Sequence, residues 1–170
     1  VDNILGQDNE FANDAFDDVL SVQNLSALNR AEQQYMIAKR SKTAVDTSLV
    51  GVSAQSPVET IEAAIATTET ALDDYRTLLL SMTDVLEATP PIGGLSQAQL
   101  DGLKTSIQTA RGTIVGQITS VTNQQQAIDS AKNSFDSLEI AYEKALRDLE
   151  AAESNLAADI RAGEAQLSQI

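Results

Sequence analysis

The chain has 170 residues, a net charge of −14, and no histidine or cysteine. Without these residues, Ser-His and Cys-His catalytic pairs, disulfides and thiolate metal sites are excluded. The acidic charge repels phosphates and anionic lipid headgroups, which argues against nucleic acid or a membrane surface as a partner. No apolar run approaches the ~20 residues that cross a bilayer, so direct membrane insertion is not expected.

Four helices are predicted in chain order, near residues 8–21, 26–50, 57–88 and 96–170. The first follows apolar residues at helical spacing, and the second is expected to begin at Ser26 as its N-cap and to end by Gly51. Two capping boxes, at residues 56–59 and 96–99, predict the starts of the third and fourth helices. Between these two helices, prolines and glycines over residues 89–94 interrupt helical structure.

From Ile128 onward the apolar residues of the last helix follow a coiled-coil spacing, in alternating steps of three and four. This seam comprises Ile128, Ala131, Phe135, Leu138, Tyr142, Ala145, Leu149, Ala152 and Leu156. The third helix is long enough to pair only with the first ~30 residues of the fourth, so the seam has no partner within the chain. A lone helix buries little apolar surface, and we expect a partner. Because the chain starts without a methionine or signal peptide, we expect a piece of a longer protein and favour a helix upstream of Val1 over another chain.

These patterns predict an all-α fold: an elongated antiparallel, up-down bundle of four helices with a long C-terminal coiled-coil helix. Residues 1–127 are predicted to form the bundle, with residues 96–127 as its fourth helix. Residues 128–170 are predicted to continue that helix as a coiled-coil stalk.

Clusters of charged side chains are interpreted as surface features. The acidic groups are Asp14, Asp17, Asp18, Asp73, Asp74, Glu139 and Glu143, and the basic residues of the second helix are Arg30, Lys39, Arg40 and Lys42. Carboxylate-bridged metal sites in helical bundles use Glu-x-x-His pairs, which cannot be written without histidine. We therefore predict no catalytic residue, no cofactor and no metal site, and expect the basic residues to pair with acidic neighbours.

The candidate partner-binding residues lie at one predicted tip of the bundle. If the helices alternate in direction, the break at residues 23–25 and the turn at residues 90–94 lie together there. The site would comprise Leu25, Pro90, Pro91, Ile92, Gly93 and Gly94. Irregular backbone with uncharged side chains can dock a protein, although a simple connector that closes the bundle is the alternative.

The Ala/Leu ladder of residues 131–170, centred on Leu146-Arg147-Asp148-Leu149-Glu150, resembles the α-helical hairpin of bacterial membrane fusion proteins, the periplasmic adaptor subunits of efflux and secretion systems. Residues 1–6 and 100–131 also resemble adaptor-type proteins. The resemblance implies an extracytoplasmic helical insertion, anchored through parts of the protein outside this segment. The family's lipoyl-like and β-barrel domains are absent from these residues.

The resemblance therefore predicts a helical docking and spacer domain of an adaptor that links a membrane transporter to an envelope partner. Its partners would be the transporter, other protomers or an envelope channel, and the full-length protein would be a homo-oligomer. Two alternatives remain: a free-standing structural coiled coil of a surface fibre or filament, and a helical-bundle metal carrier or enzyme.

Overall fold

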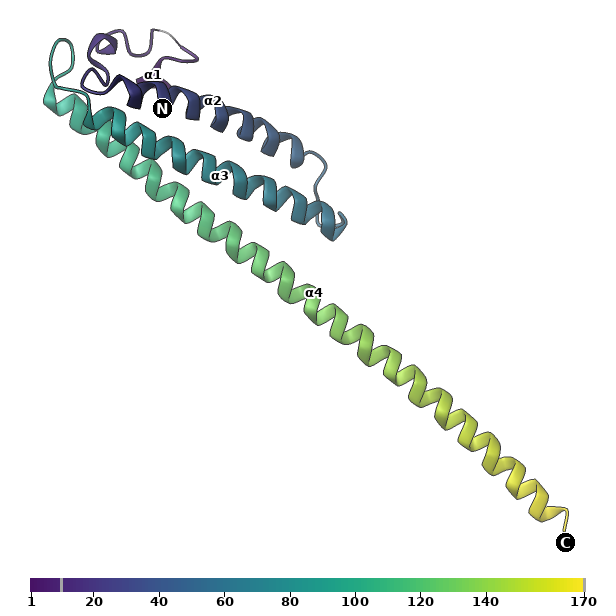
Figure 1. The fold of residues 1–170 in the computed structure, drawn as a ribbon. Helices are drawn as coiled ribbons and strands as arrows, with labels where there is room; N and C mark the ends of the chain where they lie inside the picture. Colours follow the sequence, from purple (N-terminus) through teal and green to yellow (C-terminus); the bar gives the residue numbers. More distant parts are fainter. Residues whose placement is uncertain (10, 170) are drawn as a thin grey trace. The chain divides into compact units, whose positions relative to one another are not determined.

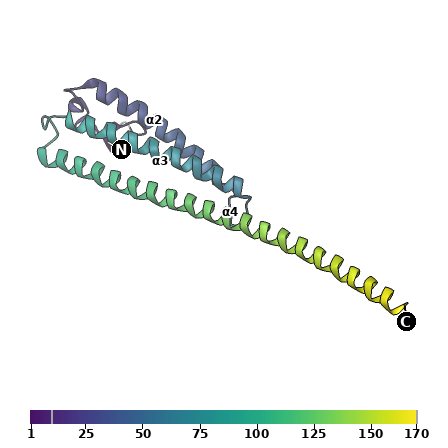
Figure 2. The same ribbon diagram turned by 60° about the horizontal axis from the view of Figure 1, so that its bottom comes forward.

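The computed structural model describes residues 1–9 and 11–169, and within them all regular structure is helical. The elements are α1 (Asp2–Leu5), a 3-10 helix η1 (Asp17–Val19), α2 (Leu25–Ser48), α3 (Val58–Glu87) and α4 (Gln97–Leu167). Figures 1 and 2 show α2 and α3 side by side along their lengths. The predicted all-α class, with four α-helices and a long last helix, is confirmed.

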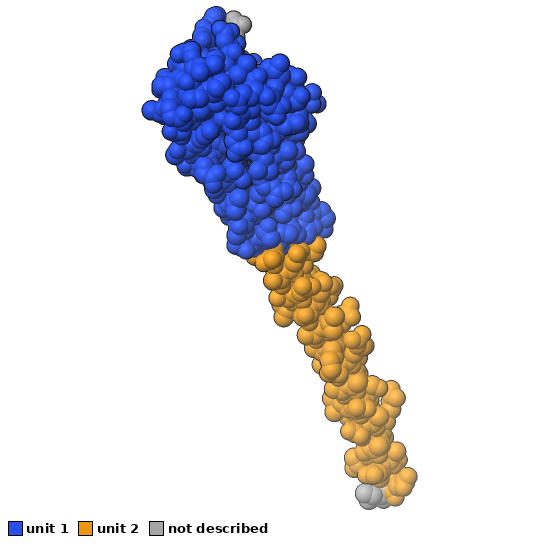
Figure 3. Space-filling model, turned by 60° about the vertical axis from the view of Figure 1, so that its left-hand side comes forward, with its two compact units in different colours: residues 1–125 blue, residues 126–170 orange. Residues whose placement is uncertain are grey.

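The chain divides into two compact units, residues 1–125 and residues 126–170, which Figure 3 colours blue and orange. The first unit contains α1, η1, α2, α3 and the beginning of α4. The second consists of the remainder of α4 and the last residues of the chain.

The core of the first unit is small and is built by α2, α3 and the start of α4. On α2 the fully buried residues are alanines, Ala27, Ala31 and Ala38, which let the backbone of α3 approach closely. The larger side chains come from α3, which buries Leu78, Leu79, Met82, Val85 and Leu86, and from α4, which buries Leu100 and Ile107. α4 packs less closely against α3 than α2 does. An open groove of about 400 Å³ lies between α3 and α4.

Three helix starts were predicted from capping residues, and one forms as expected. At α4, the Gln99 N–H donates to Ser96 Oγ at 3.3 Å and the Ser96 N–H donates to Gln99 Oε1 at 2.9 Å, which completes the capping box. α2 begins before Ser26, because the side chain of Asn24 accepts from the Ala27 N–H at 3.3 Å. The capping box at residues 56–59 does not form, since Ser56 Oγ accepts from the Ser53 N–H instead.

The first predicted helix, residues 8–21, is wrong. The chain is helical at Asp2–Leu5 and forms only turns and η1 between residues 11 and 21. Asn and Asp side chains compete for the backbone groups that a helix would use. Asn9 Oδ1 accepts from the Phe11 N–H at 3.3 Å, and the buried Asn13 donates to the Ile4 carbonyl at 3.0 Å. Phe11, an apolar residue of this segment, is 73% exposed.

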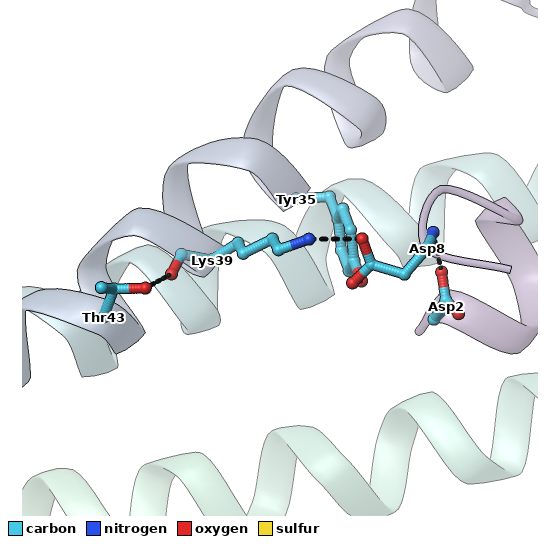
Figure 4. A network of polar contacts seen from close by, with 5 residues as sticks. All are labelled: Asp2, Asp8, Tyr35, Lys39 and Thr43. Atoms are coloured by element: carbon cyan, nitrogen blue, oxygen red, sulfur yellow. Dashed lines mark hydrogen bonds and ion pairs between the residues drawn. The ribbon is translucent and has the colours of Figure 1, made fainter. Parts of the chain in front are cut away.

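A polar network ties this irregular N-terminal segment to α2 (Figure 4). The Asp8 carboxylate accepts from the Tyr35 hydroxyl at 2.7 Å and forms an ion pair with Lys39, while the Asp8 N–H donates to Asp2 Oδ1. The hydrogen bonds from Lys39 and Tyr35 hold the pKa of Asp8 below its usual range. Burial, followed by the hydrogen bond to Asp8, raises the pKa of Tyr35 above its ordinary value.

Replacing Asp8 by asparagine should lower the melting temperature slightly near neutral pH, because exposed ion pairs contribute little. A carboxyl whose folded-state pKa is lowered stabilises the fold fully above its ordinary pKa of 3.8, and this stabilisation is lost as the pH falls through the folded-state pKa. Wild type and variant should therefore converge in acid. Thermal melts from pH 7 to pH 2, with the exposed Asp14→Asn as control, measure the difference. A gap that stays constant into acid would contradict this role for Asp8.

Candidate docking surface

The second unit carries an apolar face that no described residue of that unit covers. The large seam residues are mostly exposed: Phe135 67%, Leu138 69%, Tyr142 66%, Leu149 56% and Leu156 60%. They project from the part of α4 beyond residue 125, a single helix about 63 Å long from residue 126 to residue 167 at ~1.5 Å per residue. Exposed apolar side chains that repeat on one helix face mark an interaction surface.

Another face of the same helix is acidic. Carboxylates recur every seven residues, at Asp129, Asp136, Glu143 and Glu150. Each of them directly follows position a of the heptad, which is occupied by Ile128, Phe135, Tyr142 and Leu149. Arg147 lies 3.8 Å from the Glu143 carboxylate, and Lys144 lies 2.6 Å from that of Asp148. Charged side chains of this kind stay in water, so this helix has one apolar face and one charged face.

Of the tip residues predicted as a partner-binding site, residues 90–94 lie at the turn between α3 and α4, and Leu25 is the first residue of α2. The Gln23 N–H donates to the Ala88 carbonyl at 3.2 Å, and the Ser21 N–H donates to Thr89 Oγ1 at 2.8 Å. These bonds bring the break before α2 beside the proline-glycine turn, as the alternating helix directions predict. Leu25 is 64% exposed and Ile92 55% exposed, and Pro91 is also exposed.

The same turn is tightly anchored to the bundle. Thr89 is buried, and its hydroxyl donates to the Val85 carbonyl at 2.7 Å. Gly94 lies so close to the N-terminal segment that a Cβ there would stand 1.9 Å from the Ala15 carbonyl oxygen. Leu95, which follows, is buried in the core. The predicted tip site thus combines a closing connector with a small exposed apolar surface.

The interpretation of the basic residues on α2 as ion-pairing partners is confirmed for three of them. Arg30 lies 3.6 Å from Asp84, Lys42 lies 2.6 Å from Asp46, and Lys39 pairs with Asp8. Of the acidic candidates, Asp17 accepts from Asn13 at 3.0 Å and Asp73 lies 3.1 Å from Arg76. Within residues 1–9 and 11–169, no three acidic side chains come close enough together to hold a metal ion.

Sequence reasoning identified the seam but placed the contact site elsewhere. Heptad spacing predicts that residues 128–156 form a helix that needs a partner. The predicted partner is an upstream helix of the same protein. The contact site was instead placed at the tip, because irregular uncharged backbone stood out in the sequence. The exposed seam is the larger of the two apolar surfaces, since its side chains continue over residues 128–156.

Comparison with models of known families, with curated proteins and with solved structures found no significant match to this chain. The likeness to membrane fusion proteins therefore stays a prediction from sequence pattern. Among the residues that the structure describes, no helix has the length and apolar character needed to span a membrane.

Proposed function

We propose that this chain is a helical docking and spacer domain of a transport-system adaptor, which links a membrane transporter to a partner in the cell envelope. One observation carries the proposal: the apolar seam of residues 128–156 is exposed on a single helix. Burying such a seam contributes ~25 cal/mol per Å² of apolar area, before the entropy lost on association. The extracytoplasmic setting follows from the resemblance in sequence pattern.

A single long helix suits this role because its two faces do different work. The seam provides regularly spaced apolar side chains that insert between those of a partner helix. The acidic face keeps the helix dissolved and discourages lateral aggregation. The length of the helical segment sets how far apart the proteins at its two ends are held.

The proposal is tested by Leu138→Asp, because a carboxylate in a packed seam is costly to bury. In cells that contain the adaptor with its transporter, this change should reduce transport by about tenfold or more. The matched control is Ile140→Asp. Ile140 is 65% exposed, compared with 69% for Leu138, and lies two residues away on the opposite face of the same helix. Equal transport by the two variants would mean that the seam does not contribute to transport.

The exposed tip residues form a second, smaller contact surface within the same proposal. Ile92→Asp should leave the melting temperature nearly unchanged, since Ile92 is 55% exposed, while it weakens attachment of the envelope partner. Circular dichroism and transport are measured on the same variant. If transport is unaffected, the turn acts only as a connector.

A surface-fibre subunit is the second candidate, because an exposed seam also suits open-ended assembly. Filament growth requires contacts that do not close on themselves. Sedimentation distinguishes the two: a fibre subunit would grow without limit as its concentration rises, whereas a docking domain would stop at a small complex.

A further inference from the structure

We propose that the seam binds a second copy of this chain, with residues 131–156 of the two copies packed antiparallel and Tyr142 opposite the partner's Ala145. The inference rests on the proposed docking role of the seam and names its occupant. Sequence alone favoured a helix upstream of Val1. The sizes and charges of the seam residues favour the second copy.

Side-chain volume supports the antiparallel arrangement. In an antiparallel pair, each a position of one helix faces a d position of the other. In this seam Phe135 and Tyr142 occupy a positions, and Ala145 and Ala152 occupy d positions. Phe135 then faces the partner's Ala152, Tyr142 faces the partner's Ala145, and Leu138 faces the partner's Leu149. Every large aromatic side chain therefore meets an alanine. A parallel pair in register would place Phe135 against itself and Ala145 against itself, so crowded layers would alternate with empty ones.

Charge fixes the register. In this alignment Lys132, which flanks the seam, lies opposite the partner's Glu153, and two-fold symmetry forms the contact twice. A shift of one heptad in one direction places Glu139 opposite the partner's Glu139. A shift in the other direction places Glu139 opposite the partner's Glu153. Both shifts bring like charges together, so the alignment centred on Tyr142 and the partner's Ala145 is favoured.

The acidic face limits the assembly to two helices. A third helix would have to pack near Asp129, Asp136, Glu143 or Glu150, and removing these carboxylates from water would cost desolvation free energy. An antiparallel pair with two-fold symmetry uses the same patch on both copies and closes on itself. The expected product is a dimer.

Sedimentation equilibrium of the full chain measures the dimer. We expect a reversible monomer-dimer equilibrium, which Leu138→Asp weakens by about 100-fold, because each substitution affects two layers of the dimer. Ile140→Asp, on the opposite face, should leave the dissociation constant within about threefold of wild type. A chain that is monomeric at about 1 mM, where a complex would be worth only ~4 kcal/mol, overturns the inference.

Orientation is measured with spin labels, which is straightforward because the chain has no cysteine. Asn133→Cys and Ser154→Cys place labels on the outer face of the helix. In the antiparallel dimer, residue 133 lies level with residue 154 of the partner. A mixture of the two labelled variants therefore contains dimers in which the two labels lie level along the axis, and these dimers give the shorter label–label distance. A singly labelled Asn133→Cys dimer then has its labels offset by about 31 Å along the axis. A short distance in that dimer would indicate parallel helices and overturn the inference.

A charge exchange tests the register. Glu153→Lys should weaken the dimer about tenfold, because Lys132 then faces a lysine, and Lys132→Glu combined with Glu153→Lys should restore it. No rescue by the double variant would overturn the register. If the chain is monomeric but Leu138→Asp still abolishes transport, this inference fails while the proposed function stands. If the dimer forms but Leu138→Asp leaves transport unchanged, the proposed function fails instead.

Discussion

Replacing Leu78 by alanine should lower the free energy of unfolding of the first unit by about 3 kcal/mol. Leu78 is 1% exposed and belongs to the row of α3 that packs against α2 and α4. The substitution removes buried methyl groups and leaves a space that neighbouring side chains fill only in part. Because the core is small, this is a large fraction of the stability expected for a unit of this size.

Leu80→Ala is the matched control, since it makes the same chemical change two residues away on α3. Leu80 is 45% exposed, so its substitution should change the free energy of unfolding by less than about 1 kcal/mol. Urea denaturation followed by circular dichroism compares the two variants. Similar losses would mean that α3 does not bury the face assigned here.

A second large effect is expected at Gly94, where alanine should destabilise the first unit by about 2 kcal/mol. The new Cβ would stand 1.9 Å from the Ala15 carbonyl oxygen, which belongs to the backbone and cannot rotate away. Either the turn before α4 or the N-terminal segment must move. The loss should appear as a lower urea midpoint with an unchanged slope.

Gly102→Ala is the control and should have the opposite sign. Gly102 lies inside α4 with open space where its Cβ would be, so alanine should stabilise the helix by up to about 1 kcal/mol. If both glycines respond alike, the close approach between Gly94 and Ala15 is not present in solution.

The sequence predicted the three long helices well, because each has a local cause. α3 (Val58–Glu87) falls within one residue of its predicted bounds at each end, where Pro57 and the turn at residues 89–94 limit it. α4 starts at the predicted capping box of Ser96 and Gln99. These signals act through the backbone of neighbouring residues and need no knowledge of the tertiary fold.

The N-terminal segment could not be predicted in this way, because its structure depends on distant contacts. Apolar residues at helical spacing suggested a helix, but Asn13 instead bonds to Ile4, and Asp8 bonds to Tyr35 and Lys39 of α2. Ser21 adopts a left-handed conformation, with φ of 51°, because Thr89 and the Asn24 carbonyl hold it there. These partners lie as many as 68 residues away.

The candidate site was only partly predictable for a related reason. Heptad spacing predicted that residues 128–156 need a partner, and in the structure Leu138 and Tyr142 are exposed. In the sequence, prolines and glycines distinguish the tip from the helices. In the structure, Thr89, Gly94 and Leu95 pack within the first unit and close the bundle. Sequence pattern therefore located the apolar surface but did not rank it above the turn.

Hydrogen exchange of peptides across residues 131–156 tests most directly the central claim, that this helix is held by a partner on its seam. A lone helix of this length is only marginally stable in water. We predict that these amides exchange at least ~10-fold more slowly at concentrations where the chain is dimeric than where it is monomeric. Peptides of α3 (Val58–Glu87) should show no such dependence. Equally slow exchange of residues 131–156 in dilute, monomeric protein would contradict the account, because the helix would then stand without a partner.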